Sequence, residues 1–180
     1  MKQPLLKRVK RVLEHEGAIV DVYSDYMELP DGKVEKWDYV EHRKGAAAVV
    51  PVLPDGRILM VRQYRNALER STLEIPAGSR DSKTEPTVEC AARELEEETG
   101  YRCENLEFLL SLRTTVAFCN EMVDVYLARD LIPSHQRLDE GEFIDLEPHT
   151  VEELCSLIYQ GIIQDGKTVA AIMAYKNKYL

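Results

Sequence analysis

Apolar and polar residues alternate along the N-terminal part of the chain. The alternation runs from Ala18 to Glu41 and is interrupted by Pro30-Asp31-Gly32, a combination typical of a tight turn. Because successive side chains of a strand point to opposite faces of a sheet, this pattern predicts an antiparallel hairpin or meander. Gly17 and Gly45 mark its approximate limits.

A second pair of apolar runs lies on either side of Pro54-Asp55-Gly56, which predicts another hairpin. The first of these runs starts at Ala46 and is almost entirely apolar, as expected of a central strand that is buried on both faces. Shorter runs predict four further strands, at residues 73–76, 106–112, 122–128 and 143–146.

The segment after these hairpins has helical periodicity. The helix is predicted to span residues 86–99, with Thr84 or Ser82 as its N-cap and Gly100 just past its end. Its core face is predicted to lie opposite its acidic residues and to consist of Val88, Ala91, Ala92 and Leu95.

Two more helices are predicted near the C-terminus. One begins with a capping box at Thr150 and continues to about Tyr159, and the last spans about residues 167–178. Mixed strands with helices on both faces predict an α/β fold, an α/β/α sandwich with a mixed sheet. A small N-terminal antiparallel β lobe precedes it, so we expect a lobe at residues 1–45 and a main domain at residues 46–180.

The composition excludes several classes of protein. A hydrophobic content of 44% is enough for a folded core, and the net charge of −9 argues against binding to nucleic acids or anionic membranes. An anionic substrate stays compatible with this charge, because a bound cation reverses the local sign.

Other sequence features bear on location. No segment is long enough to span a membrane, and residues 1–17 are basic without the apolar stretch of a signal peptide. The four cysteines, which lack metal-site spacing, predict reduced, buried thiols in a cytoplasmic protein: Cys90, Cys103, Cys119 and Cys155.

The predicted helix at residues 86–99 carries an unusual concentration of acid. Glu94, Glu97 and Glu98 are spaced i, i+3 and i+4, so their carboxylates share one face. Like charges at this spacing destabilise a helix unless a cation lies between them, and Mg2+, with Mn2+ as a substitute, is the natural partner of such oxygens. The alternative is a solvated acidic surface without a ligand.

The residues around these acids resemble the Nudix box, G-x5-E-x7-R-E-U-x-E-E-x-G-U, in which U is a bulky apolar residue. Glu85 and the run from Arg93 to Tyr101 match the second half of the pattern fully. Gly78 is followed by six residues instead of five before Glu85, and we expect the extra residue to lengthen a polar loop and leave the helix intact.

The resemblance implies an enzyme that hydrolyses a nucleoside diphosphate linked to another group. It implies metal ligation by Glu94, Glu97 and Glu98, by the main-chain carbonyl of Ala77, and by Glu142 from a later acidic loop. Arg93, four residues before Glu97, is expected to orient that carboxylate.

Further segments resemble the ADP-ribose pyrophosphatases within this family. The run from Leu73 to Gly78 looks like their LEIPAG segment, which makes Glu74 and Gly78 candidate substrate-binding residues. The run Gln63-Tyr64-Arg65 looks like their Q-Y-R segment, in which the arginine contacts substrate. Val116 departs from the subgroup, which usually has a proline at that position.

The N-terminal lobe resembles the part that these enzymes exchange across a homodimer. Trp37, the only tryptophan, lies near the strand positions that hold adenine in them. Its ring is expected either to stack on adenine or to anchor the dimer interface.

The catalytic base is expected on the loop Asp139-Glu140-Gly141-Glu142. By the resemblance, Glu140 is the base and Glu142 its metal-binding partner, and Glu97, Glu98 and Arg93 complete the catalytic group. The alternative is an exposed acidic turn.

The predicted reaction is the Mg2+-dependent hydrolysis of ADP-ribose, a small nucleoside diphosphate, to AMP and ribose 5-phosphate. Two alternatives stay open, a hydrolase of another nucleotide sugar or dinucleotide and a non-catalytic nucleotide-sugar sensor. An mRNA-decapping enzyme needs a basic path for RNA, which a chain of charge −9 disfavours.

Overall fold

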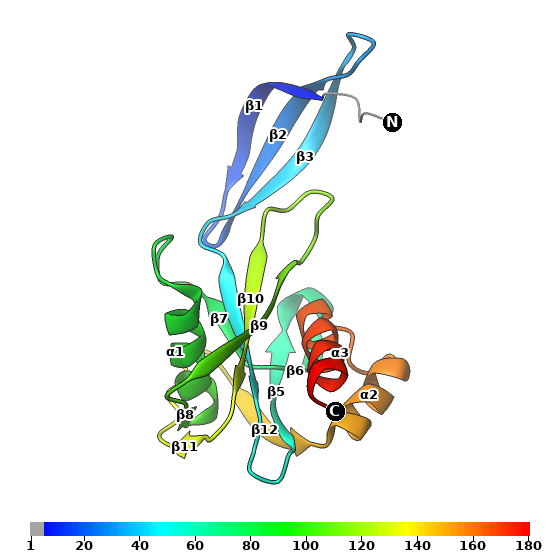
Figure 1. The fold of residues 1–180 in the computed structure, drawn as a ribbon. Helices are drawn as coiled ribbons and strands as arrows, with labels where there is room; N and C mark the ends of the chain where they lie inside the picture. The colour runs from blue at the N-terminus through cyan, green and yellow to red at the C-terminus, as the bar shows by residue number, and fades with distance from the viewer. Residues whose placement is uncertain (1–5) are drawn as a thin grey trace.

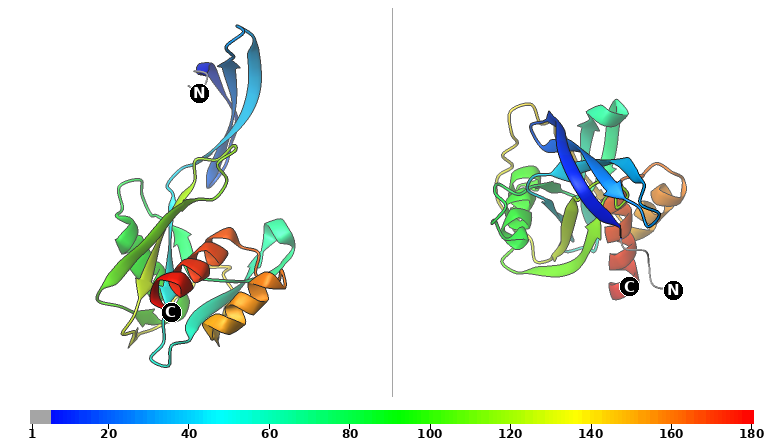
Figure 2. Two further views of the ribbon diagram at one scale, coloured as in Figure 1. Left: turned by 45° about the vertical axis from the view of Figure 1, so that its right-hand side comes forward. Right: turned by 90° about the horizontal axis from the view of Figure 1, so that it is seen from above.

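A computed structural model describes residues 6–180, so the first five residues of the predicted lobe lie outside the described residues. A three-stranded sheet extends away from a body in which helices flank one four-stranded and one three-stranded sheet (Figures 1 and 2). The predicted α/β/α arrangement with a mixed sheet is confirmed.

The extended sheet is antiparallel, with strand order β1-β2-β3. Its strands are β1 (Lys7–Glu16), β2 (Val20–Glu28) and β3 (Val34–His42). The predicted turn between β2 and β3 is confirmed, with Gly32 at φ +84°. β1 lacks a regular alternation of apolar and polar residues, so it was not predicted from the sequence. The division of the chain at residue 45 stays a prediction.

Ion pairs stabilise this lobe where an apolar core is small. The Arg11 guanidinium donates two hydrogen bonds of 2.6 Å to Asp25 and lies 3.8 Å from the centre of the Tyr39 ring. Near the other end of the lobe, Arg43 pairs with Asp21. Both aspartates are buried, so each needs its arginine to offset the loss of hydration.

Two sheets form the centre of the body. The mixed sheet has the order β7-β4-β10-β9, in which β4 and β10 are parallel and the other neighbours antiparallel. Its strands are β4 (Ala46–Pro51), β7 (Ala77–Ser79), β9 (Leu106–Arg113) and β10 (Met122–Ala128). The antiparallel second sheet, β12-β5-β6, contains β5 (Ile58–Arg65), β6 (Arg70–Glu74) and β12 (Ile144–His149). The short strands β8 (Tyr101–Arg102) and β11 (Ile132–Pro133) pair with each other, and a 3-10 turn spans Asn66–Leu68.

The predicted hairpin across Pro54-Asp55-Gly56 is wrong. The turn forms, with Gly56 at φ +86°, but β4 and β5 enter different sheets, and a single bridge between Val52 and Ile58 closes the turn. β4 and the first half of β5 are apolar and buried, and each strand is paired on both edges by other strands, β4 by β7 and β10, and β5 by β6 and β12.

β4 separates two apolar layers, as expected of a buried central strand. Ala47 and Val49 pack on the side of α1 (Thr87–Thr99). Ala48 and Val50 belong to the larger core beneath α2 (Val151–Tyr159) and α3 (Gly166–Tyr179). Because all four side chains are fully buried, β4 is fixed from both faces, and so is the strand β7 paired with it.

The start of α1 differs from the prediction. Pro86 is the N-cap residue and provides no side-chain hydrogen bond, whereas the Ser82 hydroxyl accepts from the N–H groups of Thr84 and Glu85 within the preceding loop. Ser82 is therefore used by a local turn and cannot reach the helix. The predicted end is confirmed, because Gly100 adopts φ +70° and its N–H closes the last turn.

The predicted core face of α1 is also partly wrong. Ala91 and Leu95 are fully buried, but Val88 is 39% exposed. Glu94 and Glu98 are themselves buried, on the side of the helix that faces β7 rather than opposite the core. The acidic face and the apolar face thus adjoin each other along the helix.

The four cysteines are free thiols. Cys90 and Cys155 are buried as predicted, whereas Cys103 and Cys119 are partly exposed, which corrects the expectation for those two. Among the helices of residues 6–180, none has the length and apolar character needed to cross a bilayer.

The last two helices begin with side-chain caps. The predicted capping box at Thr150 is confirmed, with Glu153 as its second member. Asp165 caps α3 by accepting from the N–H of Thr168, and the Thr168 hydroxyl in turn accepts a 3.0 Å bond from the N–H of Ile75. This bond ties the start of α3 to the segment between β6 and β7.

Replacing Thr168 with valine tests the tie. The side chain is fully buried, so Thr168→Val keeps its volume but leaves the Ile75 N–H without its partner. We expect the free energy of unfolding to fall by about 1–3 kcal/mol in urea denaturation. Thr84→Val, at an exposed threonine, is the control and should change it by less than about 0.5 kcal/mol. Equal stability of the two variants would contradict the tie.

Candidate active site

A polar recess of about 330 Å3 lies between β7, α1 and the loop before β12. The backbone of Ala77 to Ser79 lines one side, and the other lining residues are mostly charged. These include the acids Glu94, Glu97, Glu98 and Glu142 and the cations Lys44, Arg80, Arg93 and Arg137. The recess therefore brings together the predicted ligands from α1, Ala77 of β7 and Glu142 of the acidic loop.

The close approach of α1 to β7 explains Gly78. A Cβ atom at this position would lie about 2.2 Å from the carboxyl group of Glu94, so any other residue would force that carboxyl group to move. Next to it, the N–H of Ala77 donates a 3.1 Å hydrogen bond to Glu98. Two successive residues of β7 thus lie against the two buried carboxylates of α1, and one of them donates a hydrogen bond.

Burial disfavours the ionised form of these two carboxyl groups. Desolvation, with the charges of Glu97 and Glu142 added, raises the pKa of Glu94 to about 7 even though Arg93 opposes the shift. Desolvation and the charges of Glu94 and Glu142 raise the pKa of Glu98 to about 8. Ionised together, these groups need a positive partner in the recess.

Arg93 supplies part of that charge. Its Nη1 atom donates to Glu94 at 2.7 Å and to Glu97 at 2.9 Å, and Nη2 donates to the carbonyl of Ser79 at 3.0 Å. The Nε atom lies 3.5 Å from the carboxylate of Glu85. The arginine therefore links the helix, β7 and the preceding loop, in the position expected of a residue that orients Glu97.

The loop between Gly78 and α1 accommodates the additional residue of the motif. Arg80 crosses the loop and donates to the carbonyls of Lys83, Glu85 and Lys44. The extra length projects before the helix (Figure 1), and Gly78 keeps its contact with Glu94.

The residues of the recess fit a hard divalent cation. Its donors are carboxylate and main-chain oxygens, which such cations prefer, and burial together with neighbouring carboxylates raises the pKa values of Glu98 and, despite the charge of Arg93, of Glu94. In residues 6–180, no three His, Cys, Asp or Glu side chains converge as a metal centre. Arg93 and the Ala77 N–H hold the carboxylates instead, so the side chains would reorient on ligation.

The two glutamates of the acidic loop occupy different places. Glu142 lines the recess, whereas Glu140 lies outside it on an exposed turn next to Gly141, which has φ +90°. The backbone of the turn is closed by a bond from the Glu142 N–H to the Asp139 carbonyl.

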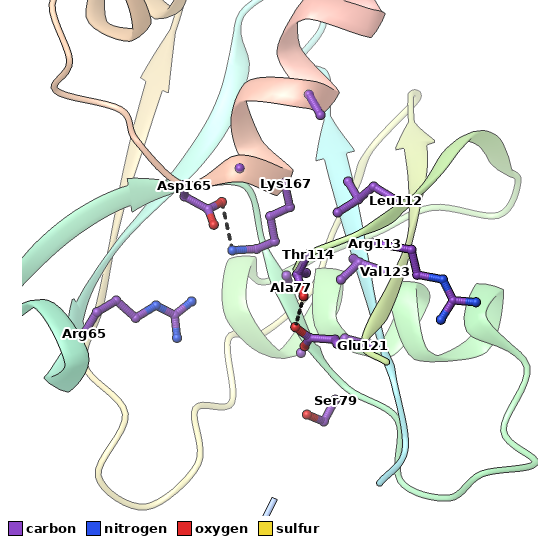
Figure 3. A pocket seen from close by; sticks show the side chains of 14 residues that line it. Arg65, Ala77, Ser79, Leu112, Arg113, Thr114, Glu121, Val123, Asp165 and Lys167 are labelled. Atoms are coloured by element: carbon purple, nitrogen blue, oxygen red, sulfur yellow. Dashed lines mark hydrogen bonds and ion pairs between the residues drawn. The ribbon is translucent and has the colours of Figure 1, made fainter. Parts of the chain in front are cut away.

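A second recess, of about 630 Å3, adjoins the first and shares Ala77, Gly78 and Ser79 with it. Figure 3 shows Arg65 and Lys167 at its wall, reaching it from β5 and α3. Glu121 and Arg113 also line this recess, and Figure 3 shows the Arg113 guanidinium directed away from Arg65 and Lys167.

Glu74 holds this wall together from behind. It is buried and accepts two hydrogen bonds from Arg65, at 2.8 and 2.7 Å, and a third from Lys167. Although burial alone would raise the pKa of Glu74, these cations lower it to about 2. The Glu74 carboxylate is therefore fully engaged by these ion pairs. Arg65 and Lys167, rather than Glu74, line the recess.

Some site residues lie apart from these recesses or were not foreseen. Trp37 is 42% exposed on β3 and lines a separate recess with Val40 and Phe118.

Lys167 was not predicted as a site residue. Its signal in the sequence is only its place in the first turn of a helix capped by Asp165, and its role depends on contacts between distant segments.

Comparisons with known proteins agree with this geometry. Residues 42–172 match the family model described as the NUDIX domain. The chain is 41% identical to the methanol dehydrogenase activator of Bacillus methanolicus, over 92% of this chain and 90% of that protein. It is 40% identical to the ADP-ribose pyrophosphatase of Bacillus subtilis, over 90% of this chain and 88% of that protein.

Its fold is also found among solved structures. The crystal structure of an ADP compounds hydrolase superposes with a TM-score of 0.86 at 21% identity, over 98% of this chain and 94% of that one. Since the family model covers most of the chain and the site carries the carboxylates of the motif, the protein belongs to the Nudix family and is a Nudix hydrolase.

Proposed function

We propose that this Nudix hydrolase cleaves ADP-ribose to AMP and ribose 5-phosphate and requires Mg2+, with Mn2+ as a substitute. The observation that carries the proposal is the position of two buried carboxylates, Glu94 and Glu98, beside a recess walled by Arg65 and Lys167. The Bacillus subtilis relative named ADP-ribose pyrophosphatase supports the choice of substrate.

The proposed cation ligands are Glu94, Glu97, Glu98, Glu142 and the main-chain carbonyl of Ala77. A bound Mg2+ would offset the negative charge of the pyrophosphate and acidify a water molecule. Arg93 keeps the Glu97 carboxylate in place through its 2.9 Å bond.

The cationic wall positions the substrate. Arg65 and Lys167 are both held by Glu74, so these basic side chains meet an anionic pyrophosphate without first having to be ordered. Gly78 leaves the room that Glu94 needs beside the substrate recess.

Hydrolysis of a panel of compounds tests the proposal. The panel contains ADP-ribose, ADP-glucose, UDP-glucose, GDP-mannose, diadenosine polyphosphates and NADH, each with excess Mg2+ and with products separated by chromatography. We expect AMP to appear fastest from ADP-ribose and its formation to stop when EDTA is added. Faster cleavage of another compound would contradict the substrate, and tight nucleotide binding without cleavage of any of them would contradict catalysis.

Glu98→Gln is the matched control for this experiment. Its amide oxygen can still accept from the Ala77 N–H, and because burial raises the pKa of the Glu98 carboxyl group, we expect its replacement by a neutral amide to preserve stability. We expect an unchanged fold, measured by circular dichroism, without turnover. A fully active Glu98→Gln enzyme would overturn the ligand assignment.

Glu140 is the proposed catalytic base, carried toward the recess by rearrangement of the turn at Gly141. Glu140→Gln should lower kcat by about 10²-fold or more, the usual contribution of a general base. Glu142→Gln should instead raise the Mg2+ concentration needed for half-maximal activity. Glu104→Gln, at an exposed position, is the control. An unchanged kcat in Glu140→Gln would move the role of base to Glu142.

We also propose that the protein is a homodimer in which the N-terminal lobe contacts the partner. The lobe extends from the body (Figure 2) and exposes apolar side chains, including Val9, Leu13, Val34 and Trp37. We expect twice the chain mass of 20.6 kDa by light scattering, and a shift toward monomer in Trp37→Ser. A monomeric wild-type protein at micromolar concentration would contradict the proposal.

A further inference from the structure

A third recess, of about 310 Å3, lies where the lobe joins the body. Residues 41–46 form one side, and the loop before α1 and the ends of β9 and β10 form the rest. Its lining includes two acids, Glu41 and Glu121, and five basic side chains: Arg43, Lys44, Arg80, Lys83 and Arg113.

Most of these cations lack a carboxylate partner. Arg43 is neutralised by its bidentate pair with Asp21. Arg80 donates to main-chain carbonyls, and Arg113 donates to the carbonyl of Asn120. Carbonyl groups satisfy the hydrogen bonds of a guanidinium but leave its charge in place.

The two lysines also have few carboxylates close enough to offset their charge. Lys83 is 71% exposed, and its nearest acid, Glu41, lies 4.0 Å away, at the limit of an ion pair. Within residues 6–180, no carboxylate lies within ion-pair distance of Lys44. Glu121 is shared between Thr114 and His42.

This concentration of positive charge contrasts with a net charge of −9. Clustered cations repel one another unless an anion lies between them, and the acids in the lining offset only part of this positive charge. We propose that this recess binds a phosphate group, a compact dianion that the guanidinium of Arg113 and the ammonium groups of Lys44 and Lys83 can contact together.

The position of the recess gives the ligand access from both neighbouring sites. It shares Lys44 and Arg80 with the carboxylate recess, which contains Glu94 and Glu98. It shares Arg113 and Glu121 with the substrate recess, which is walled by Arg65 and Lys167. The phosphate is therefore either inorganic phosphate from solution or a phosphate group carried by a bound nucleotide.

Calorimetric titration with inorganic phosphate tests the site. EDTA is present so that no metal ion in the carboxylate recess binds the phosphate. The test variant is Lys83→Gln, because Lys83 lines this recess and neither of the two neighbouring ones, and the control is Lys33→Gln on the lobe, which changes the net charge equally. We expect wild type and control to bind alike, and the test variant to bind at least tenfold more weakly.

Two results would overturn the proposal. One is the absence of phosphate binding to the wild-type protein, and the other is equal binding to the test variant with an unchanged melting temperature. Because this titration needs no turnover, its failure is distinct from a failure of the proposed hydrolysis.

A second measurement, which rests on the proposed function, assigns the source of the phosphate. If the recess holds a substrate group, the ratio of kcat/KM for ADP-ribose 2′-phosphate to that for ADP-ribose falls in the test variant and not in the control. If it holds free phosphate, the ratio is unchanged while the binding loss persists. Each result supports the site and identifies one of the two sources.

Discussion

The contact between α1 and β7 is the constraint on which the active site depends. It places the Glu94 carboxyl group where any side chain on residue 78 would have to be, and it sets the Ala77 N–H against Glu98. Two ionisable groups are thereby taken out of water, at a cost that an apolar pair in the same place would not incur. The packing of the rest of the body offsets this cost, because β4 is packed from both sides and holds β7 in register.

Lobe and body are stabilised in different ways. The body has a continuous apolar core beneath α2 and α3, whereas the lobe relies on buried ion pairs such as Arg11 with Asp25. The connection between them is polar as well, since the main chain at Val40 and His42 bonds to the segment around Asn120. Loss of one partner of a buried pair would leave an isolated charge, so the lobe is the more sensitive part to single substitutions at charged positions.

The sequence predicted elements whose signals are local. The end of α1 at Gly100 and the capping box at Thr150 follow from a few adjacent residues, and both are confirmed. The predictions that failed needed information from distant segments. Ser82 has the chemistry of a helix cap but is used by its own loop, and β4 and β5 look like a hairpin until their other neighbours are known.

The same distinction applies to the site. The carboxylates of α1 were found because a motif brings them together within one helical stretch. Lys167 and Arg113 come from segments far from that motif, and only the tertiary structure places them at the recesses. Trp37 and Glu140 were selected by resemblance alone, and both lie outside the two central recesses.

The Glu74 network has a consequence for acid tolerance. Because the pKa of Glu74 is about 2 in the folded protein, below its ordinary value of 4.5, its ion pairs favour the folded state fully above that ordinary value. That contribution is lost progressively only as the pH falls from there toward 2. Mild acidification therefore leaves Arg65 and Lys167 in place, and the wall of the substrate recess is set by folding rather than by the protonation state of its surroundings.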